Sequence, residues 1–190
     1  MANRGNKVGA ILFDGVTEHV VPARAGRRHV MYLIDKILSH PRRLRTPPTD
    51  IGAFLRRSGA AIRRRSVTFV VSDFIAPPGW DVALSALGQR HETVAVHLVD
   101  PLETALPDLG LLAFEDAESG QQLFVDTSDP AFRDRFAAQA QQHEEAILGA
   151  FARAGVDAFE LATDGDLLDA MLGFADMRRA QARSSYSGAV

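Results

Sequence analysis

The sequence predicts an α/β protein in which helices flank a mostly parallel sheet. The first indication is Val67–Val71, an unbroken β-branched and aromatic run without polar alternation, a pattern typical of a strand buried on both faces. The second is Glu92–Val99, another strand-like run that follows a helical segment. Strand, helix and strand in succession are typical of parallel neighbours. We therefore expect Val67–Val71 to lie in the interior of a parallel sheet.

The residues before Val67 predict a hairpin and two helices. Lys7–Asp14 and Glu18–Pro22 are apolar strand-like runs on either side of an Asp-Gly turn signal. Gly26–Leu38 has helical spacing, and its apolar stripe consists of Val30, Leu33, Ile34, Ile37 and Leu38. A second helix is expected from Thr49 or Asp50, either of which can serve as N-cap, to about Ser58-Gly59.

The residues after the first buried strand continue the alternation of helix and strand. Three apolar side chains of the next helix, Val82, Leu84 and Leu87, are expected to point inward, and the helix after Asp129-Pro130 is expected to bury His143. The predicted elements are a helix over Trp80–Gln89, a hairpin of Leu109–Phe114 with Gln122–Val125, a helix from Asp129 to Gly155, a strand over Phe159–Ala162 and a helix over Thr163–Ala180. We expect one domain over residues 7–180, followed by a flexible tail over residues 181–190.

Composition excludes several classes of function. The chain has no cysteine, which excludes disulfides, thiolate catalysis and cysteine-metal sites. No apolar run approaches the roughly 20 residues needed to span a bilayer, and the N-terminus lacks the apolar core of a signal peptide. We expect a cytoplasmic protein that does not bind membranes.

Charge is unevenly distributed along the chain. Twelve of the 21 basic residues lie between Arg24 and Arg65, with only two acids among them. Between His91 and Phe132 there are nine acids and no lysine or arginine. This distribution favours two patches that partly neutralise each other in the fold, with a basic face for an acidic partner as the alternative. Nucleic-acid binding through Arg42–Arg65 is the weaker hypothesis, because Phe54 is the only aromatic residue there that could stack on a base.

The motifs of common enzyme classes are missing. Ile11–Gly15 resembles the start of a haloacid-dehalogenase-type enzyme, but Leu12 stands where the nucleophilic aspartate would be. Glycine-rich phosphate loops and nucleophile elbows are absent from the sequence. The six histidines have no zinc-ligand spacing, and we expect His91 to be a hydrogen-bonding turn residue.

Oxygen ligands are the better candidates for a site. Asp73, Thr49, Asp50, Asp100 and Glu103 are expected along one edge of the sheet, where the carboxyl ends of parallel strands meet. Hard oxygen ligands suit Mg²⁺. The alternative interpretation of Asp73 is that it caps the following turn or helix.

Several segments taken together resemble a known family over Lys7 to about Arg178. They are Lys7–Phe13, Gly26–Val30, Thr49-Asp50, Arg64–Ser66, Ser72–Phe74, Arg90–Glu92, Asp100–Glu103, Leu106–Gly110, Asp116–Gly120 and Val125–Thr127. In this order they resemble the domain-of-unknown-function 58 family (DUF58). The resemblance implies a Rossmann-like sheet of the von Willebrand factor A type with a metal-ion-dependent adhesion site at its top.

The resemblance also implies which residues could form that site. By position, Thr49 matches the threonine of the adhesion site and Asp73 its aspartate. The Asp-x-Ser-x-Ser loop is not in this sequence, nor are the family's central first strand and the helix after it. We expect Thr49 and Asp73 to be remnants that bind Mg²⁺ weakly or not at all, since two side chains supply too few oxygens.

The missing strand should leave Lys7–Phe13 and Val67–Val71 with unpaired edges. Either the chain is a fragment, or these strands pair directly, or a second chain fills the gap, for example in a homodimer. As function, the resemblance implies a non-catalytic adaptor or chaperone-like partner of a MoxR-type AAA+ ATPase, acting in assembly or metal loading of client proteins. The alternative is a metal-dependent hydrolase that uses Asp73, Asp100 and Glu103.

Overall fold

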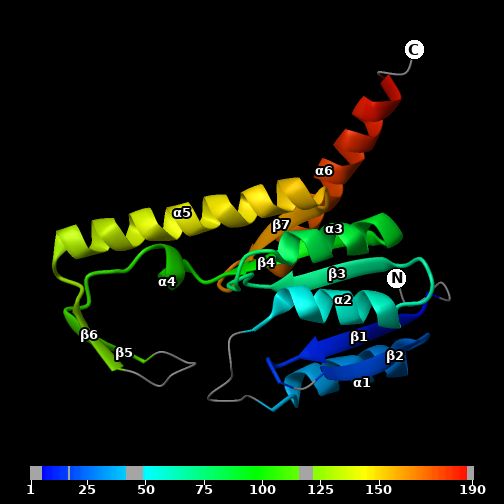
Figure 1. Cartoon of the computed structure of the whole chain (residues 1–190), viewed down its shortest axis with the longest axis horizontal. Helices are drawn as coiled ribbons and strands as arrows, with labels where there is room; N and C mark the ends of the chain where they lie inside the picture. The colour runs from blue at the N-terminus through cyan, green and yellow to red at the C-terminus, as the bar shows by residue number, and fades with distance from the viewer. Residues whose placement is uncertain (1–5, 17, 42–48, 116–121, 188–190) are drawn as a thin grey trace.

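The computed structural model describes residues 6–16, 18–41, 49–115 and 122–187. Helices and strands are interspersed along the chain and alternate from α2 to α4 (Figure 1). The elements are β1 (Val8–Phe13), β2 (Glu18–Arg24), α1 (Arg27–Leu38), α2 (Ile51–Ala61), β3 (Val67–Ser72), α3 (Trp80–Arg90), β4 (Glu92–Val99), α4 (Pro101–Thr104), β5 (Leu111–Glu115), β6 (Gln122–Asp126), α5 (Pro130–Ala154), β7 (Asp157–Ala162) and α6 (Leu167–Ser187). The predicted elements are all present, and their ends shift by a few residues.

A three-stranded parallel sheet in the order β3-β4-β7 forms the centre of the fold. Val67 pairs with Glu92 at one end of the β3–β4 ladder and Ser72 with His97 at the other. β4 pairs with β7 along its second edge. Two antiparallel hairpins, β1–β2 and β5–β6, complete the strands of the described residues. The predicted α/β class, the parallel sheet and the small hairpin are confirmed.

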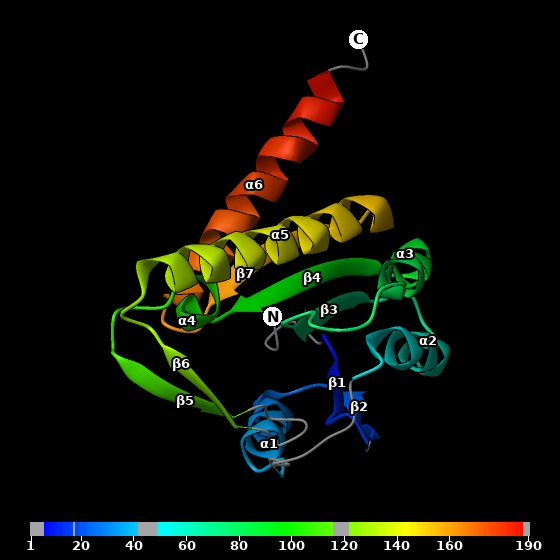
Figure 2. The ribbon, with the colours of Figure 1, turned by 60° about the vertical axis from the view of Figure 1, so that its left-hand side comes forward.

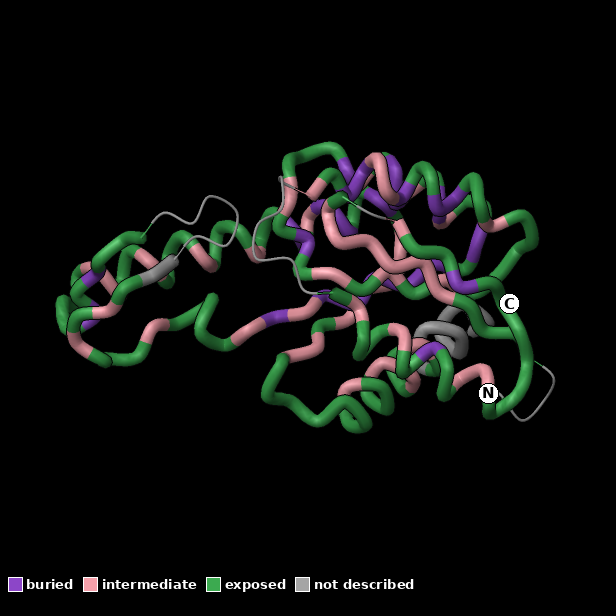
Figure 3. The backbone as a smooth tube through the Cα atoms, turned by 90° about the horizontal axis from the view of Figure 1, so that it is seen from below, coloured by how far each residue is buried: buried purple, intermediate pink, exposed green. Residues whose placement is uncertain are grey.

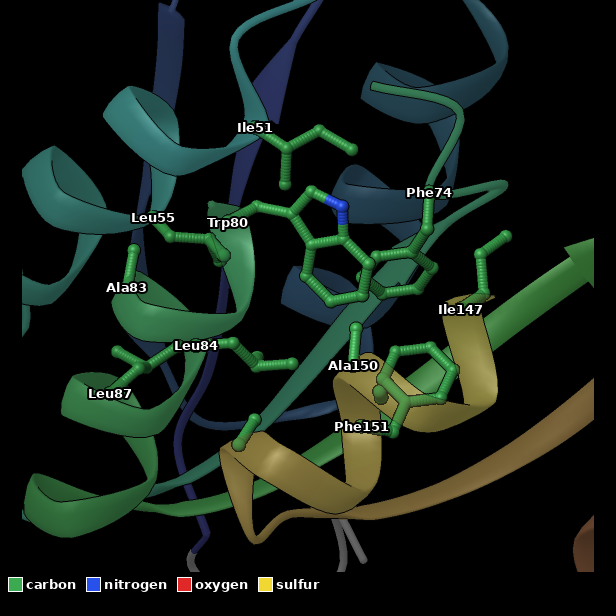
Figure 4. Close-up of a cluster of buried hydrophobic side chains, with 12 residues drawn as sticks. Ile51, Leu55, Phe74, Trp80, Ala83, Leu84, Leu87, Ile147, Ala150 and Phe151 are labelled. Carbon is green, nitrogen blue, oxygen red and sulfur yellow. The ribbon is translucent and has the colours of Figure 1, made fainter. Parts of the chain in front are cut away.

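The hydrophobic core lies between one face of this sheet and three helices (Figure 4). Three aromatic rings form its centre. The Phe74 ring lies 4.9 Å from that of Trp80 and 4.8 Å from that of Phe151. Aliphatic side chains surround the rings: Ile51 and Leu55 from α2, Leu84 and Leu87 from α3, and Ile147 from α5. Burial of this apolar surface is the main stabilisation that the structure offers.

The opposite face of the sheet is only partly covered. α6 packs there through Phe174, whose ring lies 4.7 Å from that of Phe159 on β7. The Arg178 guanidinium pairs with Glu92 at 2.7 Å and with Asp157 at 3.1 Å, on β4 and β7 respectively. Coverage therefore extends over β7 and β4 but not over β3.

The prediction that Val67–Val71 is an interior strand buried on both faces is wrong. β3 pairs only with β4 among the described residues, so it lies at an edge. Its outward side chains Val67, Phe69 and Val71 are 52–58% exposed. β4 is the strand buried on both faces, as the burial of Val94 and Ala95 shows. The apolar pattern was correct for a strand but did not reveal which neighbours it has.

Other side chains also differ from expectation. In α1 only Leu33 of the predicted stripe is buried, and Ile34, Ile37 and Leu38 are exposed. Val82 on α3 is exposed, whereas Leu84 and Leu87 are buried as predicted. His143 is exposed on α5, not in the core. α6 continues to Ser187, into the segment expected to be a flexible tail.

Burial is concentrated in one part of the molecule (Figure 3). The buried residues gather around α2, α3, β4 and the C-terminal part of α5, while the β5–β6 hairpin and the start of α5 are mostly exposed. Among the described residues, no helix combines the length and apolar character needed to cross a bilayer.

Candidate functional site

Asp73 follows β3 at the carboxyl edge of the sheet, where it was predicted. Its carboxylate accepts hydrogen bonds from the Ile75 backbone N–H at 3.1 Å and from the Ser72 hydroxyl at 3.3 Å. The Ser72 hydroxyl in turn accepts from the Phe74 N–H at 3.1 Å. These bonds close the turn after β3, which is the capping role considered as the alternative for Asp73.

Phe74 occupies an unusual backbone conformation in this turn. Its φ is 56°, a left-handed value that bulky residues rarely adopt. The side chain is nearly fully buried between Trp80 and Phe151. Packing of the ring therefore stabilises the turn that presents Asp73 at the surface.

Thr49 and Asp50 precede α2. The Asp50 carboxylate accepts from the Ala53 N–H at 2.7 Å, so Asp50 is the N-cap. Thr49 is half-buried, and its carbonyl accepts from the Ile51 N–H at 3.0 Å. Both predicted residues stand at the helix start, and Asp50 rather than Thr49 caps it.

Asp100 and Glu103 belong to the short helix after β4. The Asp100 carboxylate accepts from the Leu102 N–H at 3.0 Å, and Glu103 is exposed on α4. Among the described residues no group of three or more histidine, aspartate or glutamate side chains could hold one metal ion. The structure thus does not bring Asp73, Asp100 and Glu103 together as a metal centre. That Thr49 and Asp73 bind Mg²⁺ weakly or not at all stays a prediction.

A histidine and a glutamate lie close together near the same edge, and the sequence analysis did not predict this pair. His97 on β4 is buried, and its Nδ1 lies 3.6 Å from Glu144 Oε2 on α5. The imidazole packs against the rings of Phe74 and Phe151, with centroids 6.1 and 6.2 Å away. No spacing rule links residues so far apart in the chain, so only the fold could identify this contact.

His91 is buried between the end of α3 and the start of β4, and the prediction that its side chain forms a hydrogen bond there is wrong. Neither ring nitrogen has a hydrogen-bond partner among the described residues. Burial lowers the pKa of His91 below 6.5, and the positive charges of Arg90 and Arg65 lower it further. The side chain therefore resists protonation in the folded protein.

A shallow cavity of about 420 Å³ lies where β1 ends and α2 begins. Its lining includes Phe13, Glu18, Asp50 and Arg57. The Arg57 guanidinium pairs with Glu18 at 3.0 Å and lies 5.6 Å from the centroid of the Phe13 ring. The Arg57 guanidinium and the Glu18 carboxylate in this cavity therefore neutralise each other's charge.

Part of the basic segment predicted as a nucleic-acid surface, residues 42–48, lies outside the described residues. Of the arginines that are described, Arg57 pairs with Glu18 of β2. The other described arginines of this segment provide no specific support for nucleic-acid binding.

Several large apolar side chains are exposed at the surface. They include large side chains of β3 and of α1. Contiguous exposed apolar patches are typical of interaction surfaces. The fold is thus an α/β domain with exposed apolar side chains on β3 and α1.

Comparison with known proteins identifies the family. The chain matches the model described as "Protein of unknown function DUF58" over residues 1–146, and it belongs to this family. The uncharacterized protein Rv1480 of Mycobacterium tuberculosis is 32% identical over 184 residues, which make up 96% of this chain and 57% of the relative. The corresponding protein Mb1516 of Mycobacterium bovis gives the same values. The chain thus spans little more than half the length of these relatives.

A shorter relative and two solved structures are also similar. The uncharacterized protein MAV169 of Mycobacterium avium is 32% identical over 159 residues, or 84% of this chain and 94% of the relative. The conserved hypothetical protein BatB from Bacteroides thetaiotaomicron is 13% identical, with 92% of this chain and 79% of that chain covered at a TM-score of 0.49. An aerotolerance-related membrane protein from Bacteroides fragilis is 15% identical, with 83% and 72% covered at a TM-score of 0.48.

Proposed function

We propose that this DUF58 chain is a non-catalytic interaction module whose partner is a MoxR-type AAA+ ATPase. The role that follows is that of an adaptor or chaperone-like protein in assembly or metal loading of client proteins. The family resemblance suggests the partner. One structural observation carries the binding role, namely the exposed apolar side of α1.

The exposed side of α1 has the spacing of a helical docking surface. Met31, Ile34, Ile37 and Leu38 are 56%, 43%, 53% and 81% exposed. They recur at intervals of three and four residues, so they share one side of the helix. Helices with such anchors bind by inserting them into an apolar groove of a partner.

The opposite side of α1 anchors the helix to its own domain. Leu33 is buried, and the His29 ring lies 2.9 Å from the Val8 carbonyl oxygen through its Nε2. A helix that is held on one side and apolar on the other presents its anchors in a fixed orientation. Such preorganisation reduces the entropy that a partner must remove on binding.

The hydrogen bonds of three aspartates at strand ends and helix starts also favour protein binding over metal-dependent chemistry. Asp50, Asp73 and Asp100 each accept a backbone N–H bond that forms a turn or caps a helix. Their geometry is accounted for by local structure. Among the described residues, no specific contact favours the hydrolase alternative.

A direct binding measurement tests the proposal. A MoxR-type AAA+ ATPase from the same genome is mixed with this chain, and binding is followed by analytical ultracentrifugation. We expect a complex that is weakened at least roughly tenfold by Ile34→Lys, since a charge would enter the apolar contact. The matched control is Val82→Lys, which adds the same charge at an exposed site on α3. If the wild-type chain and the ATPase do not associate, the partner is wrong. If Ile34→Lys binds as tightly as Val82→Lys does, the α1 surface is wrong.

A further inference from the structure

We infer that the outer face of the β5–β6 hairpin binds a basic amphipathic helix of a client protein. This inference rests on the proposed adaptor role and concerns the client rather than the ATPase. The hairpin and α1 are separate surfaces, so each can be tested without the other. The position of the hairpin, its fixed base and the side chains of its outer face support the inference.

The hairpin lies away from the hydrophobic core. In two views it is separate from the three-stranded sheet, and the chain reaches it through α4 and leaves it through the start of α5 (Figures 1 and 2). The buried residues of α5 (Ile147, Ala150, Phe151 and Ala154) all belong to the second half of that helix. The hairpin therefore projects from the part of the domain that contains the core, where a partner can reach it.

Polar contacts fix the base of the hairpin. Thr127 is fully buried there, and its hydroxyl accepts from the Leu109 N–H at 3.0 Å and donates to the Gly110 carbonyl at 2.7 Å. The Thr127 N–H donates to the same carbonyl at 2.8 Å. The Arg133 guanidinium on α5 donates to the Thr127 carbonyl at 2.5 Å and lies 4.0 Å from the Asp108 carboxylate. A two-stranded hairpin is marginal by itself, and these bonds hold this one in a defined orientation.

The outer face of the hairpin is mainly apolar. Residues directly opposite each other on antiparallel strands share a face, and this face consists of two such pairs, Leu111 with Asp126 and Ala113 with Phe124. All four residues are exposed, Leu111 to 72% and Phe124 to 67%, whereas Val125 on the inner face is buried. The solvent face of an antiparallel sheet is usually polar. An apolar face in this position is typical of an interaction surface.

Negative charge surrounds these apolar side chains. The sequence contains nine acids and no lysine or arginine between His91 and Phe132. The Ser128 hydroxyl and then the Ser128 N–H donate to the Asp126 carboxylate and lower its pKa, so Asp126 is ionised at neutral pH. Asp108 is exposed beside the base of the hairpin. Such a surface repels nucleic acids and anionic lipid headgroups and attracts a cationic protein segment.

The shape of this surface favours a helix as its occupant. The two strands of a hairpin lie about 5 Å apart, and a helix with its side chains is about 10 Å across, so one helix covers the face. Its apolar stripe would contact Leu111 and Phe124, and long basic side chains beside the stripe would reach Asp126. An extended segment would pair along an edge of the hairpin instead and would leave the outer face exposed.

A synthetic helical peptide tests the inference directly. The probe is a leucine and lysine peptide of about 18 residues, or five turns, with leucine at intervals of three and four and lysine elsewhere. Its binding to the full chain is measured by fluorescence anisotropy at low and at moderate salt. We expect saturable binding that weakens as the salt concentration rises.

Two control peptides separate the apolar and the charged contributions. The first has the same composition, but its leucines are distributed around the whole helix. The second keeps the leucine stripe and has glutamate in place of lysine. Each should bind roughly tenfold more weakly than the probe, because one lacks a continuous apolar stripe and the other has the wrong charge.

Three variants of the chain locate the site. Phe124→Ser and Leu111→Ser remove an apolar contact from one strand each, and Asp126→Asn removes the charge of the outer face while it keeps a hydrogen-bond acceptor. Each variant should weaken binding of the probe roughly tenfold. For Asp126→Asn the dependence on salt should also become less steep.

Matched controls make the same changes at exposed positions elsewhere. Leu148→Ser lies in the second half of α5, and Asp169→Asn lies on α6. Both should bind the probe as the wild type does. The near-ultraviolet signal of Trp80 checks that the core of every variant is folded.

Several results would overturn the inference. Equal binding by Phe124→Ser, Leu111→Ser and Leu148→Ser would show that the outer face is not the site, and equal binding of the glutamate peptide would show that its charge does not select a basic partner. Self-association of the free chain that Phe124→Ser abolishes would make a second copy the occupant. Binding to anionic lipid vesicles that Phe124→Ser abolishes would make a membrane the occupant.

One variant separates this inference from the proposed function. Ile34→Lys, on α1, should bind the probe normally. Loss of ATPase binding with normal binding of the probe would affect only the ATPase proposal. Loss of probe binding in Phe124→Ser with normal ATPase binding would assign the two partners to two different surfaces, as inferred.

Discussion

At the scale of single residues, the aromatic cluster connects the core to the carboxyl edge of the sheet. Phe151 contacts both Phe74 and Trp80, with ring centroids 4.8 and 5.6 Å away. Edge-to-face rings gain roughly 0.5–1.5 kcal/mol beyond their area burial. The same ring of Phe74 compensates for the left-handed backbone at the turn that contains Asp73.

Removal of one ring should therefore have a large effect. Phe151→Ala is expected to lower the free energy of unfolding by about 3–5 kcal/mol, because it leaves a cavity beneath Phe74. Urea unfolding followed by Trp80 fluorescence measures the loss. Phe132→Ala, near the exposed start of α5, is the control and should cost much less. A loss below about 1 kcal/mol for Phe151→Ala would contradict the assigned core.

His91 gives the protein a predictable dependence on pH. Its pKa is lowered in the folded state, whereas the unfolded chain titrates near 6.5. Between these values the unfolded chain binds more protons, so the stability should rise with pH and fall as the pH drops through about 6.5. Burial without a hydrogen-bond partner is the main reason.

The measurement is urea unfolding of wild type and His91→Phe at several pH values between about 7 and 5. We expect the wild type to lose stability toward the acid side and the variant to lose less. His143→Phe replaces an exposed histidine and should leave the acid loss in place. If His91→Phe and wild type have parallel pH profiles, His91 does not resist protonation as described.

At the scale of elements, the close approach of β1 and β2 depends on Gly9. A Cβ at this position would lie 2.7 Å from the Val21 carbonyl oxygen and 2.9 Å from the Ala23 nitrogen, both backbone atoms. The register of the hairpin also shifts between Val8 and Ala10. The hairpin therefore tolerates no side chain there.

Gly9→Ala should weaken the hairpin, at a cost of about 1–3 kcal/mol in unfolding free energy. Gly173→Ala is the matched control, since a Cβ there would meet nothing within 4 Å in α6. It should be neutral or stabilise the helix by up to about 1 kcal/mol. Thermal unfolding of both variants decides the point. Equal melting temperatures would show that the close contact does not constrain the hairpin.

Sequence patterns were sufficient to predict several hairpins and helix ends. Alternation, capping and turn signals located the hairpins, and Asp50, Asp129 and Gly155 mark helix ends as predicted. These signals depend on residues that are close in sequence, so they predict local structure without reference to distant parts of the chain. Burial of a whole side of an element depends on distant segments. For this reason the apolar stripe of α1 and the outward face of β3 were misjudged.

At the scale of the whole molecule, the sheet is divided. β1–β2 and β3-β4-β7 are separate sheets among the described residues, although α2 packs on both. Sequence reasoning anticipated unpaired edges at Lys7–Phe13 and Val67–Val71. It could not decide whether those strands close on each other, and the structure shows that they do not pair. The candidate site was predicted less well, because contacts such as His97 with Glu144 join distant parts of the chain.

An open apolar edge also has a consequence for solubility. Unprotected edge strands pair with one another at high concentration. We expect Val71→Lys to reduce concentration-dependent association relative to wild type, as measured by light scattering. Val82→Lys adds the same charge away from the edge and should have a smaller effect. Equal association of all three proteins would remove the β3 edge as its cause.

The most direct test of the open edge is amide hydrogen exchange along β3, resolved by nuclear magnetic resonance on the free chain. The structure predicts an alternating pattern. The amides of Thr68 and Val70, which face β4, should exchange slowly, and the amides of Phe69 and Val71 should exchange rapidly. Uniform slow exchange across Val67–Ser72 would contradict the account, because both edges of β3 would then be paired.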